Sequence, residues 1–417
     1  MRQWSLALLL LLSSIGSQGQ ITTIYDKNVK TVLLRVNEDI GGRLPVLKLG
    51  DTDVLHVSFD ELSHDYHRYI YRIEHLNADF QPENSLLESD YVKSIMDEGL
   101  IEEYEQSMNT SVLYTHYSFS LPNDYMTPLL SGNYALTVYC DDEDEPVPVF
   151  KTFFYIAEDV VSLSTTGTTN TEIDKNAQHQ QLTVHASWED LTLRDPETEI
   201  KLVILQNNRW DNAIVAPSPT TVKVNSLKWE YCRDLIFDGG NEYRKLELTS
   251  TRYPGLHIDK VRYYEPYYHV AVMTDGPRAN YLYDEDQNGR FVPLADSSSD
   301  ADVEAEYVWM HFTLDMEELG TDKAIYLNGS WTYDLFSPEY QMQYNSETNA
   351  YEASIFLKQG YYSYQYLVKD KTGETSLDPV EGNYYQTENE YTFLFYYRQA
   401  GARYDRLAGW RTASYRP

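Results

Sequence analysis

The sequence reads LNGSW at residues 327–331 and GYYSYQYLV at residues 360–368, inside a stretch that runs from Ile325 to Arg398. Aromatic or aliphatic residues alternate with polar residues here, and Asn349 and Gly373 interrupt the alternation. Such a pattern predicts short, half-buried antiparallel strands joined by tight turns. About six strands in roughly a hundred residues are typical of an immunoglobulin-like sandwich. The stretch therefore predicts a β-sandwich domain.

Length and composition extend this prediction to the whole chain. The 417 residues exceed what one hydrophobic core usually serves, so two to three domains are expected. Hydrophobic residues make up 42% of the chain and charged residues 24%, which is typical of a globular protein. The 38 tyrosines favour strands, because the ring is buried on a pleated surface while the hydroxyl stays hydrated.

We expect an all-β protein with three consecutive immunoglobulin-like or early-set β-sandwich domains. The first covers residues 20–158, the second 180–300 and the third 301–398. Residues 159–179 are rich in threonine and predict a linker. Alternating apolar residues predict strands at 54–59, 69–73, 112–121, 133–139, 149–156, 182–186, 200–206, 263–268, 270–273 and 307–314.

Acidic segments punctuate these strands. Residues 85–104 are acidic and predict a short helix, and the five acids at 141–145 predict a solvated hairpin tip. Residues 295–306, acidic and serine-containing, predict a joint between the second and third domains.

Residues 1–19 predict a secretory signal peptide. Arg2 is followed by an apolar run at 6–12 and by small residues before an expected cleavage site at Gln20. The apolar run is too short to span a bilayer and no later stretch approaches 18 apolar residues, so we expect an exported, soluble mature protein. No cysteine stands directly after the expected cleavage site, so a lipid anchor is not expected.

The chain is strongly acidic. Its formal net charge is −32, and loss of Arg2, the one charged residue of the expected signal peptide, takes it to −33. An excess of this size repels phosphate backbones and anionic lipids, so neither nucleic acid nor a membrane surface is an expected partner. A solvated acidic surface accounts for the charge without a basic partner.

The last segment, residues 399–417, differs in character. It carries four arginines against the single acid Asp405, a net charge of +3, and three large aromatic residues. Two interpretations remain open, a flexible tail and a segment that docks on an acidic surface. The aromatic residues favour docking. The arginines are Arg403, Arg406, Arg411 and Arg416, and the aromatic residues are Tyr404, Trp410 and Tyr415.

Only two cysteines are present, Cys140 and Cys232. An exported protein is permitted a disulfide, but the two residues fall in different expected domains. We therefore expect two buried free thiols rather than a disulfide.

No catalytic, cofactor or metal site is predicted. The nucleophile elbow of serine hydrolases, the zinc protease motif, the P-loop and the dinucleotide fingerprint are all absent. His64, His67 and His75 are close in sequence, but residues three apart on a strand face opposite ways, which argues against a shared metal. With 65 acids, a carboxylate pair for glycoside hydrolysis cannot be singled out. We expect a protein that is not an enzyme.

A partial calcium motif occurs at Asp284, Asp286 and Asn288. The residue at the twelfth position is Ala295, where an EF-hand needs a bidentate glutamate. The Asn-Gly pair at 288–289 is more simply a hairpin turn between the aromatic residues at 281–283 and Phe291.

The LNGSW run and the tyrosine-rich hairpin after it resemble the early-set sandwiches that include starch- and glycogen-binding modules. The resemblance covers less than a quarter of the chain and implies that exposed aromatic rings stack on sugars. Trp331, Trp229 and the tyrosines are the candidates, while burial in a core is the commoner fate of such residues.

A wider set of short runs covers nearly all of the expected mature chain. In chain order they are EHLNADF (74–80), SMNT (107–110), YTHY (114–117), LPN (121–123), SGNY (131–134), LQNNRWDN (205–212), GNEYR (240–244), DQNG (286–289), EGN (381–383), TENEY (387–391), YYR (396–398) and RYDRLAG (403–409). Taken in this order, the runs resemble the type IX secretion system plug protein family. Phe80 departs from the resemblance, because tryptophan is expected there.

The resemblance implies a periplasmic, non-enzymatic subunit that closes the inner mouth of a giant outer-membrane β-barrel when no cargo passes. The implied partner is that barrel, without direct insertion into the membrane, and no cofactor is implied. The alternative hypothesis is a periplasmic carbohydrate-binding protein, and an enzyme ranks third.

Overall fold

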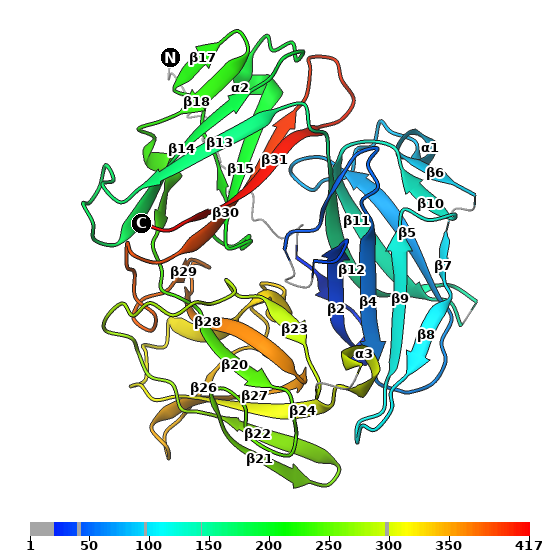
Figure 1. Cartoon of the computed structure of the whole chain (residues 1–417), viewed down its shortest axis with the longest axis vertical. Coiled ribbons are helices and arrows are strands. Elements are labelled where there is room, and N and C mark those ends of the chain that lie inside the picture. Colours follow the sequence, from blue (N-terminus) through cyan, green and yellow to red (C-terminus); the bar gives the residue numbers. More distant parts are fainter. Residues whose placement is uncertain (1–20, 40–42, 96–97, 143, 297–299) are drawn as a thin grey trace, which may run out of the picture.

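The computed structural model describes residues 21–39, 43–95, 98–142, 144–296 and 300–417, so the expected signal peptide lies outside the described residues. Strands dominate, in three β-rich bodies (Figure 1). The helices in the described part are single turns: α1 (Glu88–Tyr91), α2 (Pro196–Glu199), α3 (Ala301–Glu304), and the 3-10 turns η1 (Arg233–Leu235) and η2 (Ser330–Thr332). The prediction of an all-β sandwich fold is confirmed.

The first body, residues 23–157, consists of two sheets that enclose one core. The larger sheet has the order β1-β12-β11-β5-β7 with β3 parallel to β12, and the smaller has the order β2-β4-β9-β8. Alternate residues of β9 are buried, as the period of two requires. The strands are β1 (Thr23–Ile24), β2 (Val29–Val36), β3 (Val46–Lys48), β4 (Leu55–Glu61), β5 (Tyr69–Leu76), β7 (Gly99–Ile101), β8 (Glu103–Gln106), β9 (Thr115–Leu121), β11 (Gly132–Cys140) and β12 (Val147–Ala157), and a ribbon pairs β6 (Val92–Ser94) with β10 (Met126–Pro128).

The second body combines residues 162–238 with residues 389–415. One sheet has the order β13-β14-β18-β17 with β19 beside β14, and the other has the order β16-β15-β30-β31. Its strands are β13 (Ser162–Thr168), β14 (His179–Ser187), β15 (Ile200–Gln206), β16 (Ile214–Val215), β17 (Thr221–Lys223), β18 (Ser226–Trp229), β19 (Ile236–Asp238), β30 (Asn389–Tyr397) and β31 (Arg406–Tyr415).

The third body, residues 244–376, is formed around the long strand β28. In one sheet β20, β23, β25 and β29 all pair with β28, and the other has the order β21-β22-β24-β27-β26. The aromatic run at 263–268 splits at its proline into the hairpin strands β21 and β22. The strands are β20 (Arg244–Leu248), β21 (Ile258–Tyr264), β22 (Tyr267–Val272), β23 (Phe291–Pro293), β24 (Tyr307–Leu314), β25 (Lys323–Asn328), β26 (Gln343–Asn345), β27 (Ala350–Lys358), β28 (Gly360–Asp370) and β29 (Thr375–Ser376).

Four expected borders between domains are wrong. The border expected between residues 300 and 301 falls inside the third body, because β20 and β23 pair with β28 and β22 pairs with β24. The expected linker at 159–179 contains β13, which pairs along its whole length with β14. The strand expected to close the third domain, β30, pairs instead with β15 of the second body. The expected tail at 399–417 contains β31, which completes that sheet beside β30. The third body is therefore inserted in the second, and Figure 1 shows β30 and β31, in red, beside green strands of the second body.

The burial of β30 gives the reason for this connection. All nine residues of β30 are buried. Tyr391, Phe393 and Phe395 face the core of the second body, whereas Leu394 and Tyr396 face an apolar layer shared with the first body. A strand that is apolar on both faces needs cover on both faces, which only a central place in the assembly provides.

That shared layer joins the first and second bodies face to face. Strands β11 and β12 contribute one side, and β15, β30 and β31 contribute the other. The buried members are Val46, Leu76, Ala78, Phe80, Ala135, Phe153, Tyr155, Ala157, Val203, Leu205, Trp210, Leu394, Tyr396 and Leu407. The first and second bodies thus share a hydrophobic core.

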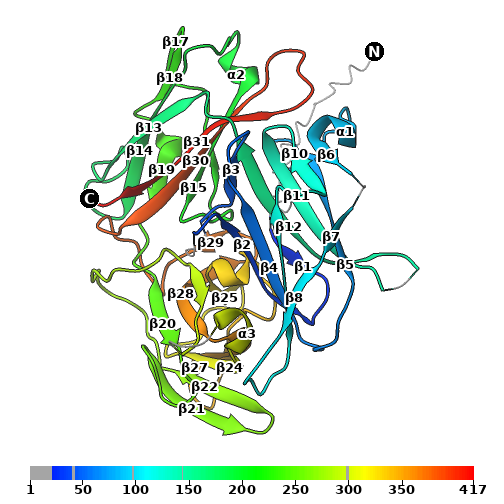
Figure 2. The same cartoon turned by 45° about the vertical axis from the view of Figure 1, so that its right-hand side comes forward.

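Two other expectations are confirmed in place. The helix expected in 85–104 is α1, and the acidic run at 141–145 lies at the β11–β12 connection, although residue 143 is outside the described residues. The joint expected at 295–306 between the second and third domains is wrong, because this segment lies inside the third body, between β23 and β24. It carries α3, which lies against the first body (Figure 2). Among the described residues, no helix has the length and apolar character that crossing a membrane requires.

Candidate functional site

A charged cluster is sealed from solvent where the first and third bodies meet. Asp60 lies opposite His116 across β4 and β9, and Tyr307 lies opposite Lys358 across β24 and β27. One Asp60 oxygen accepts hydrogen bonds from Lys358 Nζ at 2.7 Å and the Tyr307 hydroxyl at 2.6 Å, and the other lies 2.7 Å from His116 Nδ1. Asp60 is 0% and Lys358 1% exposed. Neither charge would be tolerated without the other.

The electrostatics of Asp60 follow from this arrangement. Burial raises the pKa of the Asp60 carboxyl, but the charge of Lys358 and the hydrogen bond from His116 outweigh burial and hold the pKa below its ordinary value. The carboxylate therefore stays ionised in this junction although it is buried.

The loop before β9 extends this junction. The Tyr114 hydroxyl donates to the carbonyl oxygen of Ala305 at 2.9 Å. The Glu306 carboxylate accepts from the backbone N–H of Ser111 at 2.6 Å and of Val112 at 3.0 Å. Residues 305 and 306, which end the expected joint, are therefore part of the interface between the first and third bodies.

Hydrogen bonds also cross between the first and second bodies. Asp405 Oδ2 accepts from the backbone N–H of Ala78 at 3.0 Å and from Lys201 Nζ at 3.1 Å. The Tyr396 hydroxyl donates to Asn133 Oδ1 at 2.7 Å within the buried layer. The polar groups inside this layer are thus paired, as burial requires.

Two of the four C-terminal arginines pair with acids, and a third, Arg411, donates to the carbonyl oxygen of Leu163. Arg403 Nη1 lies 2.8 Å from Asp90 Oδ2, and Arg406 Nε donates to Glu158 Oε1 at 2.9 Å. Trp410 on β31 remains 40% exposed. Of the two interpretations of this segment, docking on an acidic surface is the one that the structure shows.

The second and third bodies meet through a further buried ion pair. Arg290 Nη2 lies 2.5 Å from Glu390 Oε1, and both side chains are largely buried. Nearby, Asp334 Oδ2 accepts from the backbone N–H of Trp210 at 3.4 Å. Burial and the negative charge of Asp211 raise the pKa of Asp334 to about 6.

A cavity of about 500 Å³ opens where the three bodies meet. The first body contributes Val32 and Tyr155 to its walls, the second Trp210, and the third Trp331 and Tyr333. No histidine or cysteine is among the described residues that line it. The cavity therefore does not place a thiol or an imidazole base beside its serine and threonine hydroxyls.

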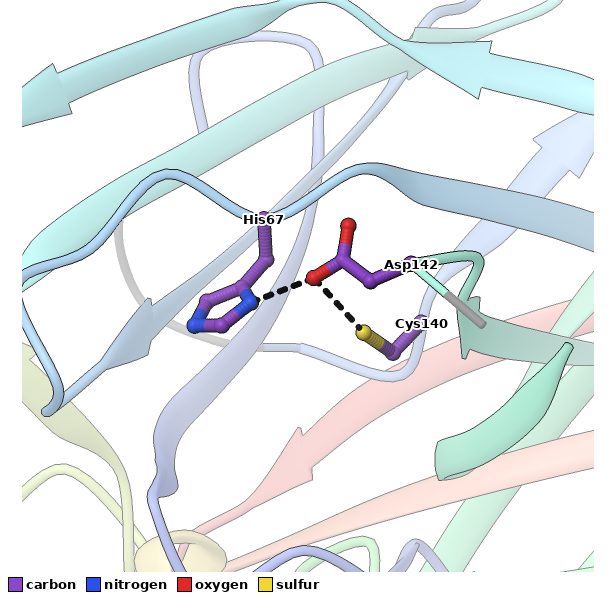
Figure 3. Close-up of side chains that lie close together, drawn as sticks. All are labelled: His67, Cys140 and Asp142. Atoms are coloured by element: carbon purple, nitrogen blue, oxygen red, sulfur yellow. Dashed lines mark hydrogen bonds and ion pairs between the residues drawn. The ribbon is translucent and has the colours of Figure 1, made fainter. Parts of the chain in front are cut away.

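His67, Cys140 and Asp142 come together at one end of the larger sheet of the first body (Figure 3). Asp142 Oδ2 lies 2.6 Å from His67 Nδ1 and 3.5 Å from Cys140 Sγ. Burial raises the pKa of the Cys140 thiol to about 11. Both cysteines are free, and Cys232 is buried while Cys140 is half-buried, so the expectation of free thiols holds and the burial of Cys140 is incomplete.

The other two histidines of the sequence cluster lie elsewhere. His64 Nδ1 is 3.1 Å from the carbonyl oxygen of Tyr114, and buried His75 Nε2 is 3.1 Å from that of Ser131. The structure thus separates the three neighbouring histidines, as expected, and gives His67 partners that no local spacing indicated.

The partial calcium motif has protein partners. Asp284 Oδ1 lies 2.6 Å from Lys245 Nζ, and Asp286 accepts from the backbone N–H groups of Tyr243 and Asn288. Burial raises the pKa of Asp286 to about 7. Residues 288 and 289 have φ values of 49° and 84°, typical of a tight turn. The predicted hairpin is wrong, because residues 281–283 form no strand and β23 pairs with β28.

The two tryptophans proposed for sugar stacking are both buried. Trp331 is 5% exposed and packs edge-on against Tyr340 and Tyr362, and Trp229 is 1% exposed. Neither ring offers a face to a ligand in solution. The carbohydrate-binding alternative therefore loses both of its tryptophans.

Comparison with known proteins supplies the family. The model for the first domain of the type 9 secretion system plug protein matches residues 29–158, which is the first body from β2 onward. The chain belongs to the type IX secretion system plug protein family. Membership makes this chain a plug-type component of type IX protein secretion.

A solved structure shares nearly the whole fold. A hypothetical protein from Parabacteroides merdae is 37% identical, with a TM-score of 0.91 over 95% of this chain and 100% of that chain. The C-terminal domain of the Streptococcus agalactiae AgI/II polypeptide BspA aligns at 8% identity over 92% of this chain and 98% of that chain, and its TM-score of 0.19 carries no argument. The comparison with curated proteins gave no match.

Several of the runs that resemble the plug family lie at junctions between the bodies. The run 74–80 meets the run 403–409 through the Ala78 and Asp405 contact, and the run 131–134 meets 396–398 through Asn133 and Tyr396. These runs supply the contacts that hold the plug-family fold together.

Phe80, where the family is expected to carry tryptophan, lies in the layer between the first and second bodies. Its ring packs edge-on against Trp210, with ring centroids 5.2 Å apart, and against Phe153 at 5.7 Å. An aromatic residue of either size suits such a site, so the departure leaves the junction intact.

The β21–β22 hairpin exposes three tyrosines. Tyr263, Tyr264 and Tyr267 are 51%, 55% and 37% exposed. Strand β21 is an edge of its sheet, paired only with β22. The aromatic run is visible in the sequence, but only the structure shows that its side chains are exposed.

Proposed function

We propose that this chain is a non-enzymatic periplasmic subunit of the type IX secretion system that occludes the periplasmic mouth of the outer-membrane translocon pore when no cargo is in transit. The observation that carries the proposal is the match of residues 29–158 to the first domain of a plug protein. The proposed partner is the giant outer-membrane β-barrel of that system.

The way the three bodies are joined supports occlusion. A barrel wide enough for folded proteins has a water-filled lumen, so closing it needs a body that keeps its shape under load. The sealed pair Asp60 and Lys358 links the first body to the third, and Arg290 and Glu390 link the third to the second. Breaking either pair leaves a buried charge, so each resists separation of the bodies.

The surface supports a reversible seal. A plug that cargo displaces needs a moderate, partly polar interface rather than a permanent apolar one. The chain carries 65 acidic and 33 basic residues, and its apolar side chains are largely gathered in four buried clusters. Charged rim contacts give specificity and fast association more than great affinity.

A native pull-down tests the partnership. The epitope-tagged chain is recovered from mildly solubilised cell envelope, and the proteins that accompany it are identified by mass spectrometry. We expect a very large outer-membrane barrel protein. Recovery of the chain alone, or with glycan-handling proteins, would contradict the proposed partner.

A permeability measurement tests occlusion separately. Cells without the chain are expected to take up a hydrophilic dye that the intact outer membrane excludes, and the wild-type chain is expected to restore exclusion. A barrel-deficient strain is the control, because loss of the plug should have no effect where there is no pore. Unchanged dye uptake in cells that lack the chain but keep the barrel would refute occlusion.

A further inference from the structure

Three candidate metal ligands meet at the end of the first body, apart from the junctions used above. His67 comes from the β4–β5 connection, Cys140 is the last residue of β11, and Asp142 lies in the β11–β12 connection. Their ligand atoms all lie within 4.8 Å of one another, and Figure 3 shows the three side chains converging. Cys140 and Asp142 are two positions apart, but His67 lies 75 positions from Asp142, so only the fold brings it to them.

The backbone holds the three groups in place. Asp142 Oδ1 accepts from the backbone N–H of Arg68 at 2.9 Å, which leaves Oδ2 directed at His67 and Cys140. The backbone N–H of His67 donates to the hydroxyl of Tyr117 at 2.8 Å. These two hydrogen bonds hold the Asp142 carboxylate and the backbone of His67 in place, as in a preformed metal site.

A relay of hydrogen bonds orients the imidazole of His67. The Ser63 hydroxyl donates to Glu61 Oε2 at 2.5 Å, so Ser63 Oγ is left to accept from His67 Nε2–H at 3.1 Å. The Glu61 carboxylate is 3% exposed. In metal sites the ligating histidine almost always donates its other ring N–H to such a partner.

This tautomer makes the contact between His67 and Asp142 informative. With the proton on Nε2, the lone pair of His67 Nδ1 faces Asp142 Oδ2 across 2.6 Å. Two acceptors at this distance repel each other unless a cation, a proton or a metal ion, lies between them. The thiol of Cys140 donates to the same oxygen at 3.5 Å, which brings a third candidate metal ligand to this point.

We propose that His67, Cys140 and Asp142 bind one zinc ion, with a fourth position open to water. The set of one thiolate, one imidazole and one carboxylate suits Zn²⁺, whereas magnesium and calcium prefer oxygen ligands alone. Bonds of about 2.0–2.3 Å to a tetrahedral ion separate ligand atoms by about 3.3–3.8 Å, so modest side-chain rotation suffices. On binding, Cys140 loses its thiol proton to solvent and coordinates as the thiolate.

The ion ties the β4–β5 connection to the β11–β12 connection. Both connections lie at one end of the larger sheet, where Tyr69 of β5 is paired with Cys140 of β11. If zinc binds the folded chain and not the unfolded chain, the free energy of unfolding rises in proportion to the logarithm of the zinc concentration. The inference does not rest on the proposed plug function and survives its failure.

The chain contains a matched control for the cysteine. Cys232 Sγ lies 3.8 Å from Asp234 Oδ2 in the same Cys-x-Asp spacing as Cys140 and Asp142. Among the described residues, Cys232 belongs to no group of three candidate ligands. Substitution of Cys232 therefore removes a thiol and leaves the proposed site whole.

The test uses the mature chain, reduced and freed of metal with a chelator. Isothermal titration with zinc chloride is expected to show one equivalent, and cobalt(II) is expected to give a thiolate-to-metal charge-transfer band. Cys140→Ser should abolish the band and weaken zinc binding by more than about 100-fold, while Cys232→Ser changes neither. Ser63→Ala, which removes only the orienting hydroxyl, should weaken binding by about 10- to 100-fold.

Circular dichroism of each variant verifies that the fold is kept. A charge-transfer band that persists in Cys140→Ser, or that is lost in Cys232→Ser, would overturn the assignment. Absence of any zinc heat in the wild-type chain would do so as well, since the interaction between His67 and Asp142 would then be an ordinary ion pair.

Discussion

At the scale of single residues, Asp60 and Lys358 couple the folding of the first body to its placement against the third. Lys358→Ala leaves the Asp60 carboxylate buried without its cation, and we expect a loss of roughly 3–5 kcal/mol in the free energy of unfolding. Denaturant unfolding followed by circular dichroism measures this loss. A change within about 0.5 kcal/mol would contradict the role given to the pair.

Two variants control for this result. Lys48 pairs with Asp159 at 2.9 Å on the open surface, so Lys48→Ala is expected to leave stability unchanged. Replacing both partners, as Asp60→Asn with Lys358→Met, removes the uncompensated charge and should recover most of the loss. Failure of the double variant to recover would assign the loss to packing instead.

Asp286 gives stability a pH dependence of known sign. Burial raises the pKa of its carboxyl to about 7 in the folded chain, against about 3.9 when unfolded. Between these values the folded chain holds one proton more than the unfolded chain, so the contribution of Asp286 is present below about pH 4 and is lost as pH rises through about 7.

Asp286→Asn is therefore expected to reduce the fall in unfolding free energy between pH 4 and pH 7. Denaturant unfolding at pH steps across this range, for the wild-type chain and the variant, measures the difference. Asp284→Asn, whose carboxylate is exposed, is the matched control and should leave the slope as it is. An identical slope for all three proteins would show that Asp286 is ionised when folded.

At the scale of the element, β31 determines whether the second body is complete. Deletion of residues 399–417 exposes an edge of β30, a strand that is buried at every position, together with apolar residues of two cores. We expect the truncated chain to aggregate or to lose cooperative unfolding, because a long apolar edge strand is a template for pairing. Size-exclusion chromatography and thermal unfolding measure both outcomes.

A shorter deletion is the control for this truncation. Removing only residues 416–417 leaves β31 whole, and we expect a monomer that unfolds at the wild-type midpoint. A monomeric chain with a wild-type midpoint after deletion of 399–417 would instead mean that β31 is dispensable, as a flexible tail would be.

At the scale of the whole molecule, the junctions predict that the three bodies keep one relative placement. Spin labels on cysteines that replace Ile95 and Val224, 77% and 89% exposed in the first and second bodies, report that placement in a Cys140→Ser, Cys232→Ser background. Pulsed electron resonance is expected to give one narrow distance distribution. A broad or double distribution would show that the first and second bodies move independently. A chain whose bodies move in this way would close a pore poorly.

Local pattern was sufficient for most strands. The alternation in β4, β5, β9 and β11 is visible in the sequence because the side-chain period of a strand is a property of the backbone itself. The turn signals at Gly132 and at Pro266 marked strand ends for the same reason. The family, too, was visible in short ordered runs, and the match over residues 29–158 confirms it.

Tertiary structure decided what pairs with what. The edge of any strand offers the same hydrogen bonds to every partner, so local pattern did not distinguish a last strand of the third body from a strand paired with β15. The structure explains the continuous apolar run from Phe393 to Tyr397, because both faces of β30 are covered. Likewise, the sequence around Trp331 does not show whether the ring lies in a core or on a sugar-binding face. Its packing against Tyr340 and Tyr362 shows that it lies in the core.

Most strands, the all-β class and the family were predictable from the sequence, because they depend on neighbouring residues, although β13 and β31 were missed. The junction at Asp60 and Lys358 and the cluster of His67, Cys140 and Asp142 were decided by the fold. Their members are distant along the chain, 298 positions apart for the ion pair, and a charge or a ligand acquires its role only when burial and distance are set by packing.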